Sequence, residues 1–283
     1  MAVITISRGC FSHGEEIAEK VAGTLGYSCV SREILVEAAQ LFNVSERKLI
    51  RSLNDAPNIL ERMVHGKERY LEYIKASLLG YARKGNIVYH GHAGHLLLTE
   101  IPQVIKVRIN AQKDDRIKLL QKRENLTKEA AAAIIENEDK NRTQWTRYLY
   151  KMDVNDLKLY DIVINIGNLT IEDACEIICL AARSKSCRTT DESKQAVDDL
   201  AIASHLRAAL QLICEAEVFV KNGDVHVMVA AQRRKKSGYI SPVLQQHIGE
   251  AYQHDLTRQI NEIAYNIPGV NKVFCQVGLP YYT

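Results

Sequence analysis

The first 26 residues constrain the fold more than any other part of the chain. Residues 2–6 (AVITI) form an apolar, β-branched run that is typical of a buried strand. A small, turn-rich loop follows, and from Glu15 apolar residues recur at helical spacing until Gly26 ends the pattern. Strand, glycine-bearing loop and helix in this order form a phosphate-binding loop in many proteins, because the N–H groups at the helix start face an anion.

This loop departs from the phosphate-loop consensus G-x-x-x-x-G-K-[ST]. Gly9 and Gly14 have the required separation, but Glu15 and Glu16 stand in the places of the lysine and of the serine or threonine. Two acids favour the first turn of a helix and disfavour a polyphosphate at the same place. The spacing therefore leaves two interpretations open, a phosphate loop and an ordinary strand-to-helix turn with an acid-capped helix.

Length and composition fit one large or two modest globular domains, since 46% of the 283 residues are hydrophobic and 25% are charged. A formal net charge of +3 does not argue for nucleic acid, so no such partner is predicted. No apolar run approaches the ~18 residues of a transmembrane segment, and the chain does not open on a signal-peptide pattern. Seven scattered cysteines without a C-x-x-C pair indicate reduced thiols and a cytoplasmic location.

Strand-like runs near residues 3, 28, 87, 104 and 161 are separated by helical patterns. This alternation predicts an α/β fold with a parallel sheet covered by helices on both faces. Ligands of such folds bind at the carboxyl ends of the strands. The loops at 7–14, 90–95 and 110–116 all follow strands, so we expect their histidines and arginines to converge on one site.

Three histidines, His90, His92 and His95, lie in one of these loops. His90 and His92 would project the same way from an extended chain, as metal ligands can. No cysteine or carboxylate lies close by in the sequence. We therefore predict no metal site and interpret the histidines as loop residues near an anionic ligand.

A long helix is predicted from Thr127, and its second half is basic. Lys140, Arg142 and Arg147 surround Trp145, with Tyr148 directly after Arg147. One interpretation is a solvated helix face with an aromatic anchor. The other is a mobile lid whose cations close on phosphates.

The C-terminal third has a different pattern. Residues 185–198 are polar and charged and are predicted to be a linker. Residues 199–283 then show helix, strand, strand, helix and strand, with Asn222-Gly223 as a strong hairpin signal between the first two strands. This order predicts a small α+β domain. The basic loop 233–236 is either simply solvated or in contact with an anionic surface.

Residues 3–184 resemble the cytidylate kinase-like family, P-loop relatives of the nucleoside monophosphate kinases. The resemblance rests on I-T-I-S-R at 4–8, G-E-E-I-A at 14–18, G-H-A-G at 91–94, D-D-R-I at 114–117, D-K-N-R at 139–142 and Y-D-I-V-I-N at 160–165. It implies a P-loop NTPase-type domain over residues 1–184, with ATP and Mg²⁺ as cofactors. The implied activity is transfer of the ATP γ-phosphoryl group to a nucleoside monophosphate such as CMP.

The same resemblance implies three groups of site residues. The donor phosphates would be held by Ser7, Arg8, Gly9, Ser12, His13 and Gly14. The acceptor would be bound by His92, Arg116 and Arg123, and the catalytic lid cations would be Lys140, Arg142 and Arg147. Family members read Gly-Ser-Gly-Gly and then a basic residue where this chain has Phe11-Ser12-His13-Gly14 and Glu15. A catalytically degenerate, nucleotide-binding regulator is therefore the alternative.

Residues 199–283 resemble a BON module, on the order of their elements, N-G-D-V-H-V at 222–227 and I-P-G-V-N-K-V at 267–273. This resemblance implies binding of lipid or protein and no catalytic residue. A third interpretation follows, in which the chain is a scaffold that binds a protein partner or an anionic membrane surface through these residues.

Overall fold

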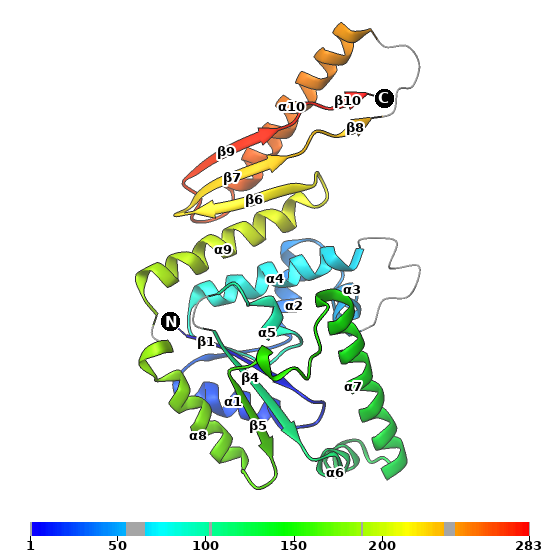
Figure 1. Ribbon diagram of the computed structural model, residues 1–283, viewed down its shortest axis with the longest axis vertical. Helices are drawn as coiled ribbons and strands as arrows, with labels where there is room; N and C mark the ends of the chain where they lie inside the picture. The colour runs from blue at the N-terminus through cyan, green and yellow to red at the C-terminus, as the bar shows by residue number, and fades with distance from the viewer. Residues whose placement is uncertain (1, 55–65, 102–103, 188, 235–240, 283) are drawn as a thin grey trace. The chain divides into compact units, whose positions relative to one another are not determined.

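The computed structural model describes residues 2–54, 66–101, 104–187, 189–234 and 241–282. The chain divides into two compact units, Met1–Lys194 and Gln195–Thr283 (Figure 1). None of the described helices combines the length and the apolarity that crossing a bilayer requires.

A five-stranded parallel sheet organises the first unit. Its strands are β1 (Val3–Arg8), β2 (Ser28–Val30), β3 (Ile87–Tyr89), β4 (Val104–Ala111) and β5 (Ile162–Ile166), in the order β2-β3-β1-β4-β5. Every neighbouring pair is parallel, which confirms the predicted sheet. Because β1 lies between β3 and β4, the loops that follow these three strands meet at one edge of the sheet.

The main core lies between this sheet and two helices, α1 (Gly14–Leu25) and α8 (Ile171–Ala182). The buried face of α1, with Ile17 and Val21, packs with that of α8 against strand residues such as Ile4 and Val107. Removal of this apolar surface from water is the main favourable term, about 25 cal/mol per Å². The core thereby fixes the direction in which the start of α1 faces the edge of the sheet.

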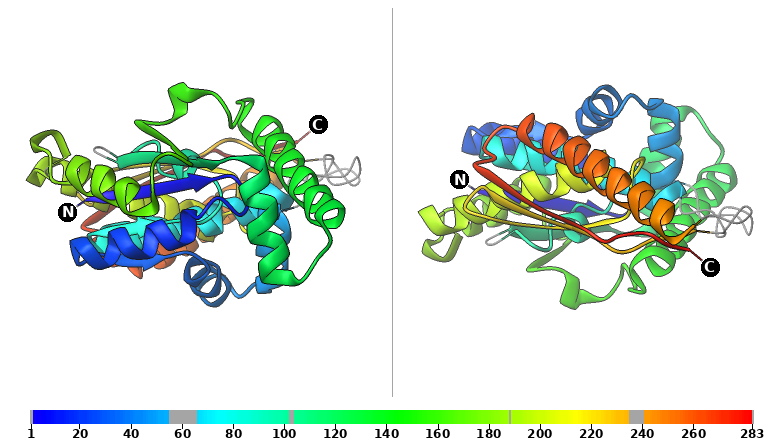
Figure 2. Two further views of the ribbon diagram at one scale, coloured as in Figure 1. Left: turned by 90° about the horizontal axis from the view of Figure 1, so that it is seen from below. Right: turned by 90° about the horizontal axis from the view of Figure 1, so that it is seen from above.

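The remaining helices follow the strands. The segment after β2 contains α2 (Glu33–Leu41), α3 (Glu46–Asn54) and α4 (Gly66–Lys84), and the short α5 (Gly94–Leu97) follows β3. After β4 come α6 (Lys113–Glu124) and α7 (Lys128–Tyr150), which lie side by side beyond the end toward which the β1 arrow points (Figure 2). Thr127 caps α7 by accepting a hydrogen bond from the N–H of Ala130, as its sequence predicts.

The second unit confirms the predicted small α+β fold. Helix α9 (Asp191–Leu210) precedes the hairpin of β6 (Ala216–Lys221) and β7 (Asp224–Val229), and α10 (Pro242–Tyr265) precedes β9 (Lys272–Val277). The sheet order is β6-β7-β9, with β6 and β7 antiparallel and β7 and β9 parallel. Asn222 and Gly223 both have positive φ, 51° and 77°, as a tight hairpin turn requires.

Two segments that follow the first domain differ from their predicted structure. Residues 191–198, predicted as linker, are helical, because Thr190 and Ser193 cap α9 reciprocally and Val197 is buried. The sequence of a mostly polar helix resembles that of a linker, because the few apolar residues that bury the helix make contacts with residues distant in the sequence. Of the basic loop, Arg233 and Arg234 form the short strand β8, which pairs with β10 (Tyr281–Tyr282), whereas Lys235 and Lys236 lie outside the described residues.

Candidate functional site

The loop between β1 and α1 does not cap the N-terminus of helix α1. Helix α1 begins at Gly14 without a side-chain cap. Within the described residues, no backbone hydrogen-bond acceptor is found for the N–H groups of residues 13 to 16. Successive free N–H groups at the positive end of a helix form a binding site for an anion such as phosphate. The interpretation as a phosphate loop is therefore favoured by geometry and not by spacing alone.

The backbone angles correct the register of this loop. The left-handed residues are Phe11 (φ 56°) and His13 (φ 63°), and neither Gly9 nor Gly14 has a positive φ. The Gly9–Gly14 register is thus wrong, and the loop follows the Phe11-Ser12-His13-Gly14 register instead. With His13 in place of the last glycine of the consensus G-x-x-x-x-G-K-[ST], Gly14 takes the consensus lysine position, and Glu15 takes the serine or threonine position.

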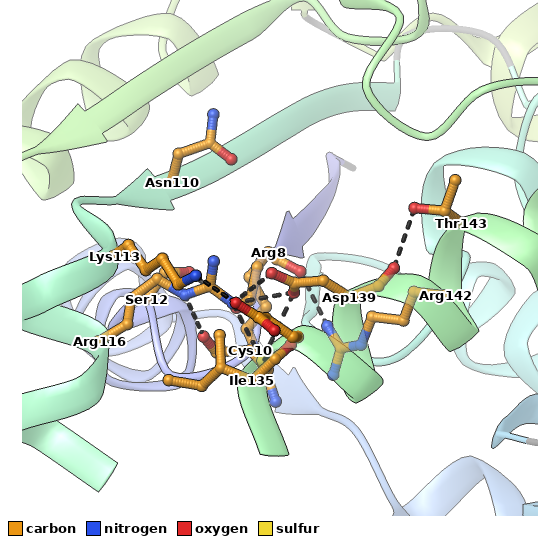
Figure 3. Close-up of polar contacts among 12 residues, drawn as sticks. Arg8, Cys10, Ser12, Asn110, Lys113, Arg116, Ile135, Asp139, Arg142 and Thr143 are labelled. Carbon is orange, nitrogen blue, oxygen red and sulfur yellow. Dashed lines mark hydrogen bonds and ion pairs between the residues drawn. The ribbon is translucent and has the colours of Figure 1, made fainter. Parts of the chain in front are cut away.

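Several long-range hydrogen bonds anchor the loop (Figure 3). The Ser12 hydroxyl points inward, 2.9 Å from the carbonyl oxygen of Gly9 and 3.1 Å from that of Ile109. Arg116 donates to the carbonyl oxygen of Cys10 at 2.7 Å and to both carboxylate oxygens of Asp139 at 2.8 Å. The two bonds to Asp139 share the Nη2 atom of Arg116, and hydrogen bonds between charged groups are stronger than neutral ones. Arg116 therefore ties the loop to α7, and its guanidinium is engaged by the protein itself.

Cys10 lies inside this clamp. Its side chain is buried, and its Sγ atom lies 3.0 Å from Arg116 Nη2 and 3.5 Å from Asp139 Oδ1. Burial, with Asp139 nearby, raises the pKa of the Cys10 thiol to about 11. The thiol is therefore protonated at neutral pH and serves as packing.

A cavity of about 560 Å³ opens at the carboxyl ends of β1, β3 and β4. Asp139 is the one acidic side chain among the described lining residues, and Arg116 already neutralises it. Five arginines from five different parts of the first unit line the cavity. They are Arg8 in β1, Arg32 in the turn before α2, Arg108 in β4, Arg116 in α6 and Arg142 in α7. This excess of positive charge favours an anionic ligand, and the volume is that of a typical small-molecule site.

The G-H-A-G loop wraps around a buried ring on β3. The Tyr89 hydroxyl donates to the carbonyl oxygen of His92 at 3.2 Å. A methyl group at Gly91 or Gly94 would overlap that ring. The left-handed residue of this loop is Ala93 (φ 57°). The two glycines are therefore needed for room, and the loop is shaped by Tyr89.

The three histidines near this loop are neutral at physiological pH. Burial, with Arg8 as the next cause, lowers the pKa of His90 to about 4. Burial lowers the pKa of His92 and of His95 to about 3, helped by Arg142 and Arg108 respectively. His92 also packs edge-on against Trp145, and its Nε2 atom is buried with no partner in the described structure. No group of three possible metal ligands occurs in the described part of the chain.

A second cavity, of about 370 Å³, lies over the phosphate loop. Ser12, His13, Gly14 and Glu15 line it, together with Arg123 from α6. Arg8 and Arg142 line both cavities. The two cavities therefore adjoin one another at these two guanidinium groups.

Helix α7 separates the three predicted lid cations. Arg142 faces inward and donates to the carbonyl oxygen of Arg8 at 2.8 Å (Figure 3). Lys140 and Arg147 are exposed and line neither cavity, and Arg147 pairs with Asp153 at 3.3 Å. Residues two apart on a helix differ by about 200° in direction, whereas residues seven apart nearly coincide. Spacing alone thus places Lys140 and Arg147 on the face opposite Arg142.

The other predicted residues divide between the cavities. Ser7, Gly9 and His92 line the larger one, so Ser7 and Gly9, two residues expected at the donor phosphates, do not line the smaller cavity over the phosphate loop. Arg123, expected at the acceptor, lines the smaller cavity. Four further polar residues that were not predicted as site residues also line the larger cavity: Arg32, Arg108, Asn110 and Asn155. Arg108 had a usable signal, because it is a charge in an otherwise apolar strand close to its carboxyl end.

Known proteins resemble the first unit. A 29% identical cytidylate kinase of Ignicoccus hospitalis aligns with 63% of this chain and 97% of its own length. A 24% identical cytidylate kinase of Methanothrix thermoacetophila aligns with 64% and 98%. An uncharacterised protein of Eubacterium ventriosum, with 21% identity and a TM-score of 0.49, covers 65% of this chain and all of its own. The model of the cytidylate kinase-like family matches residues 3–168, and the chain therefore belongs to this family of nucleotide-binding kinases.

Proposed function

We propose that the chain transfers the γ-phosphoryl group of ATP to a nucleoside monophosphate such as CMP. The observation that carries this proposal is the pair of adjoining cavities that share Arg8 and Arg142. Direct phosphoryl transfer needs a donor site and an acceptor site that meet where the phosphoryl group moves. Cations at the junction stabilise the charge that spreads over the transferring group.

The two cavities differ in the chemistry they offer. The smaller cavity presents the free N–H groups of the phosphate loop, which fits the donor phosphates, and Arg123 at its rim adds a cation. The larger cavity presents side-chain guanidiniums and the half-buried His92, which fits a monophosphate acceptor. The pKa of His92, lowered to about 3, keeps its ring neutral, so it serves as a hydrogen-bond donor and not as a charge.

The proposed reaction is an in-line displacement. An oxygen of the acceptor phosphate attacks the γ-phosphorus of ATP, and the bond from that phosphorus to the β–γ bridging oxygen breaks. The leaving group is ADP, and the acceptor becomes a diphosphate. Arg142 approaches this junction from α7, and Arg8 approaches it from β1.

Mg²⁺ is the cofactor that ATP chemistry of this kind uses, and it neutralises phosphate oxygens. It needs only one or two carboxylates besides phosphate oxygens and water. Glu15 lines the smaller cavity and has no ion-pair partner among the described residues, while Asp139 is held by Arg116. Glu15 is therefore the protein ligand that fits, so this acid becomes compatible with a metal-bound polyphosphate.

The test is a kinase assay with MgATP and a panel of CMP, dCMP, UMP and AMP, followed by chromatography of the products. We expect a diphosphate product with at least one pyrimidine monophosphate. Arg142→Ala should lower kcat/KM by at least a hundredfold, because oxyanion-type stabilisers contribute about 3 kcal/mol. Lys140→Ala is the matched control on the opposite face of α7, and we expect less than a threefold effect. Absence of any product across the panel would refute the proposal.

A degenerate, nucleotide-binding regulator is the second candidate. It is favoured by the bulky left-handed residues Phe11 and His13 and by Glu15, an acid at the position where family members carry a basic residue. It predicts that ATP raises the melting temperature by mass action without product formation. The BON-like character of residues 199–283, and their binding to a protein or an anionic surface, stay predictions that liposome and pull-down assays would test.

A further inference from the structure

The side chain of Arg8 occupies the space of a side chain at position 14. A Cβ atom built on Gly14 would lie 2.6 Å from Cδ and 2.8 Å from Cβ of Arg8. These distances are shorter than van der Waals contact allows, so residue 14 must be glycine while Arg8 keeps this path. Position 14 is the lysine position in the register set by Phe11 and His13.

The end of the Arg8 side chain is fixed by the loop after β3. Its Nη1 atom donates to the carbonyl oxygen of His90 and to the Nδ1 atom of the same residue, each at 2.7 Å. Because an arginine has no acceptor, His90 Nδ1 must be the unprotonated nitrogen. The Nε and Nη2 groups of Arg8 have no partner among the described residues. One edge of the guanidinium is thus bound, and the other is available.

The surroundings of Arg8 lack a matching anion. Burial, followed by the nearby Arg142, lowers the pKa of Arg8, and Glu15 opposes that effect. Two guanidiniums are therefore held together at the junction of the cavities with one exposed carboxylate nearby. A polyphosphate would remove this repulsion, and a planar guanidinium suits two of its oxygens.

We propose that Arg8, positioned by His90, replaces the lysine of the phosphate loop and binds the β- and γ-phosphates of ATP across Gly14. This inference rests on the proposed function and adds the residue that supplies the missing cation. Arg8 contacts the donor phosphates, whereas His90 acts only through Arg8 and is a positioning residue. Arg8 neither gives up nor takes up a proton in the reaction, because it contributes only its positive charge and its hydrogen bonds.

Isothermal titration calorimetry of the full chain with MgATP tests whether a lysine at position 14 can replace Arg8. We expect Arg8→Ala to weaken ATP binding at least tenfold. Gly14→Lys alone should also weaken it, because its side chain overlaps Arg8. The double variant Arg8→Gly/Gly14→Lys should recover binding to within about threefold of the unmodified chain, because glycine at position 8 removes both the Cβ and the Cδ atoms that a side chain at position 14 would meet. Gly23→Lys, in the same helix with nothing within 4 Å of its Cβ position, controls for an added lysine and should not change binding.

His90 variants keep the inference testable if the double variant does not fold. His90→Ala should weaken ATP binding by about threefold to tenfold, and His90→Gln, which retains an acceptor, should restore most of it. In the Arg8→Ala background His90→Ala should have no further effect. Wild-type affinity in Arg8→Ala, or a folded double variant no better than Arg8→Ala, would overturn the inference. An unmodified chain that binds no ATP would overturn the proposed function itself.

Discussion

In the loop after β1, Gly14 makes room for the side chain of Arg8, and in the loop after β3, Gly91 and Gly94 make room for the ring of Tyr89. In neither loop does a glycine supply the left-handed backbone, which falls on Phe11, His13 and Ala93. The two loops thus share one feature: a large side chain occupies the space that a Cβ atom at the glycine would need.

The side chains that fill the space above these glycines differ in flexibility and in burial. We therefore expect one loop to matter mainly for ligand binding and the other mainly for stability. Arg8 is long and flexible and ends at the edge of two cavities. Tyr89 is a ring with 1% of its surface exposed, and burial raises its pKa. Arg8 can yield to a neighbour at some loss of binding, whereas Tyr89 cannot yield without disturbing the core. We therefore expect changes in the first loop to affect ligands and changes in the second to affect stability.

Acid should cause the largest change in stability, because buried, neutral histidines lie in and next to the loop after β3. The pKa of His95 falls from an ordinary 6.5 to about 3 in the folded chain through burial, with Arg108 and Lys106 adding to the effect. The unfolded chain then binds more protons between these values, so stability is complete above about pH 6.5 and is lost as the pH falls. By linkage, His95 alone should remove about 3 kcal/mol between pH 7 and pH 4.5.

Urea denaturation of the full chain and of His95→Gln at both pH values measures this loss. The variant keeps a polar group near Tyr160, which lies 3.3 Å from His95 Nε2, but cannot titrate. We expect its unfolding free energy to fall by about 3 kcal/mol less than that of the unmodified chain. Equal losses in the two proteins would show that His95 is not held neutral.

The two crowded glycines provide the second test. Gly94→Ala should destabilise the chain by about 2 kcal/mol, because overpacking against a buried ring forces a core rearrangement. Gly14→Ala should destabilise the chain by less, about 1 kcal/mol, because the Cδ of Arg8 can move aside and alanine favours a helix, although the Cβ of Arg8 is fixed by β1. The same urea titrations at pH 7 measure both. A larger loss in Gly14→Ala than in Gly94→Ala would invert the comparison.

The smallest effect should come from the left-handed residues. His13→Gly should raise the unfolding free energy by about 1 kcal/mol, because glycine adopts a positive φ without strain. Ala93→Gly is the matched change in the second loop, and a similar gain is expected. Thermal unfolding by circular dichroism measures both variants. If only one of them gains stability, the backbone strain is not shared equally by the two loops.

The sequence was sufficient for features that depend on neighbouring residues. The run from Val3 to Ile6 predicts the central strand, Thr127 predicts the start of α7, and Asn222-Gly223 predicts the hairpin. These signals are local, because hydrophobic period, cap and turn are decided within a few residues. The direction of Arg142, opposite Lys140, was available from helical geometry as well.

Other features depend on contacts that no local pattern encodes. The hydrogen bonds of Arg8 to His90 and of Arg116 to Cys10 join residues 82 and 106 positions apart. Spacing alone gave the Gly9–Gly14 register of the phosphate loop, and only the family resemblance gave the Phe11-Ser12-His13-Gly14 register, because consensus glycines mark the loop in most chains, whereas here Phe11 and His13 take the left-handed conformation. Gly14 was misread for the same reason, since its role is to leave room.

The clamp around Cys10 has a consequence for the chemical reactivity of the chain. Thiols react with alkylating agents and oxidants as thiolates, and a pKa of about 11 leaves a thiolate fraction on the order of 10⁻⁴ at pH 7. Cys10 should therefore be among the slowest of the seven cysteines to be alkylated or oxidised. A phosphate loop that contains a sulfur atom is in this way protected from peroxide, and a fluorescent maleimide can label other cysteines while the loop stays intact.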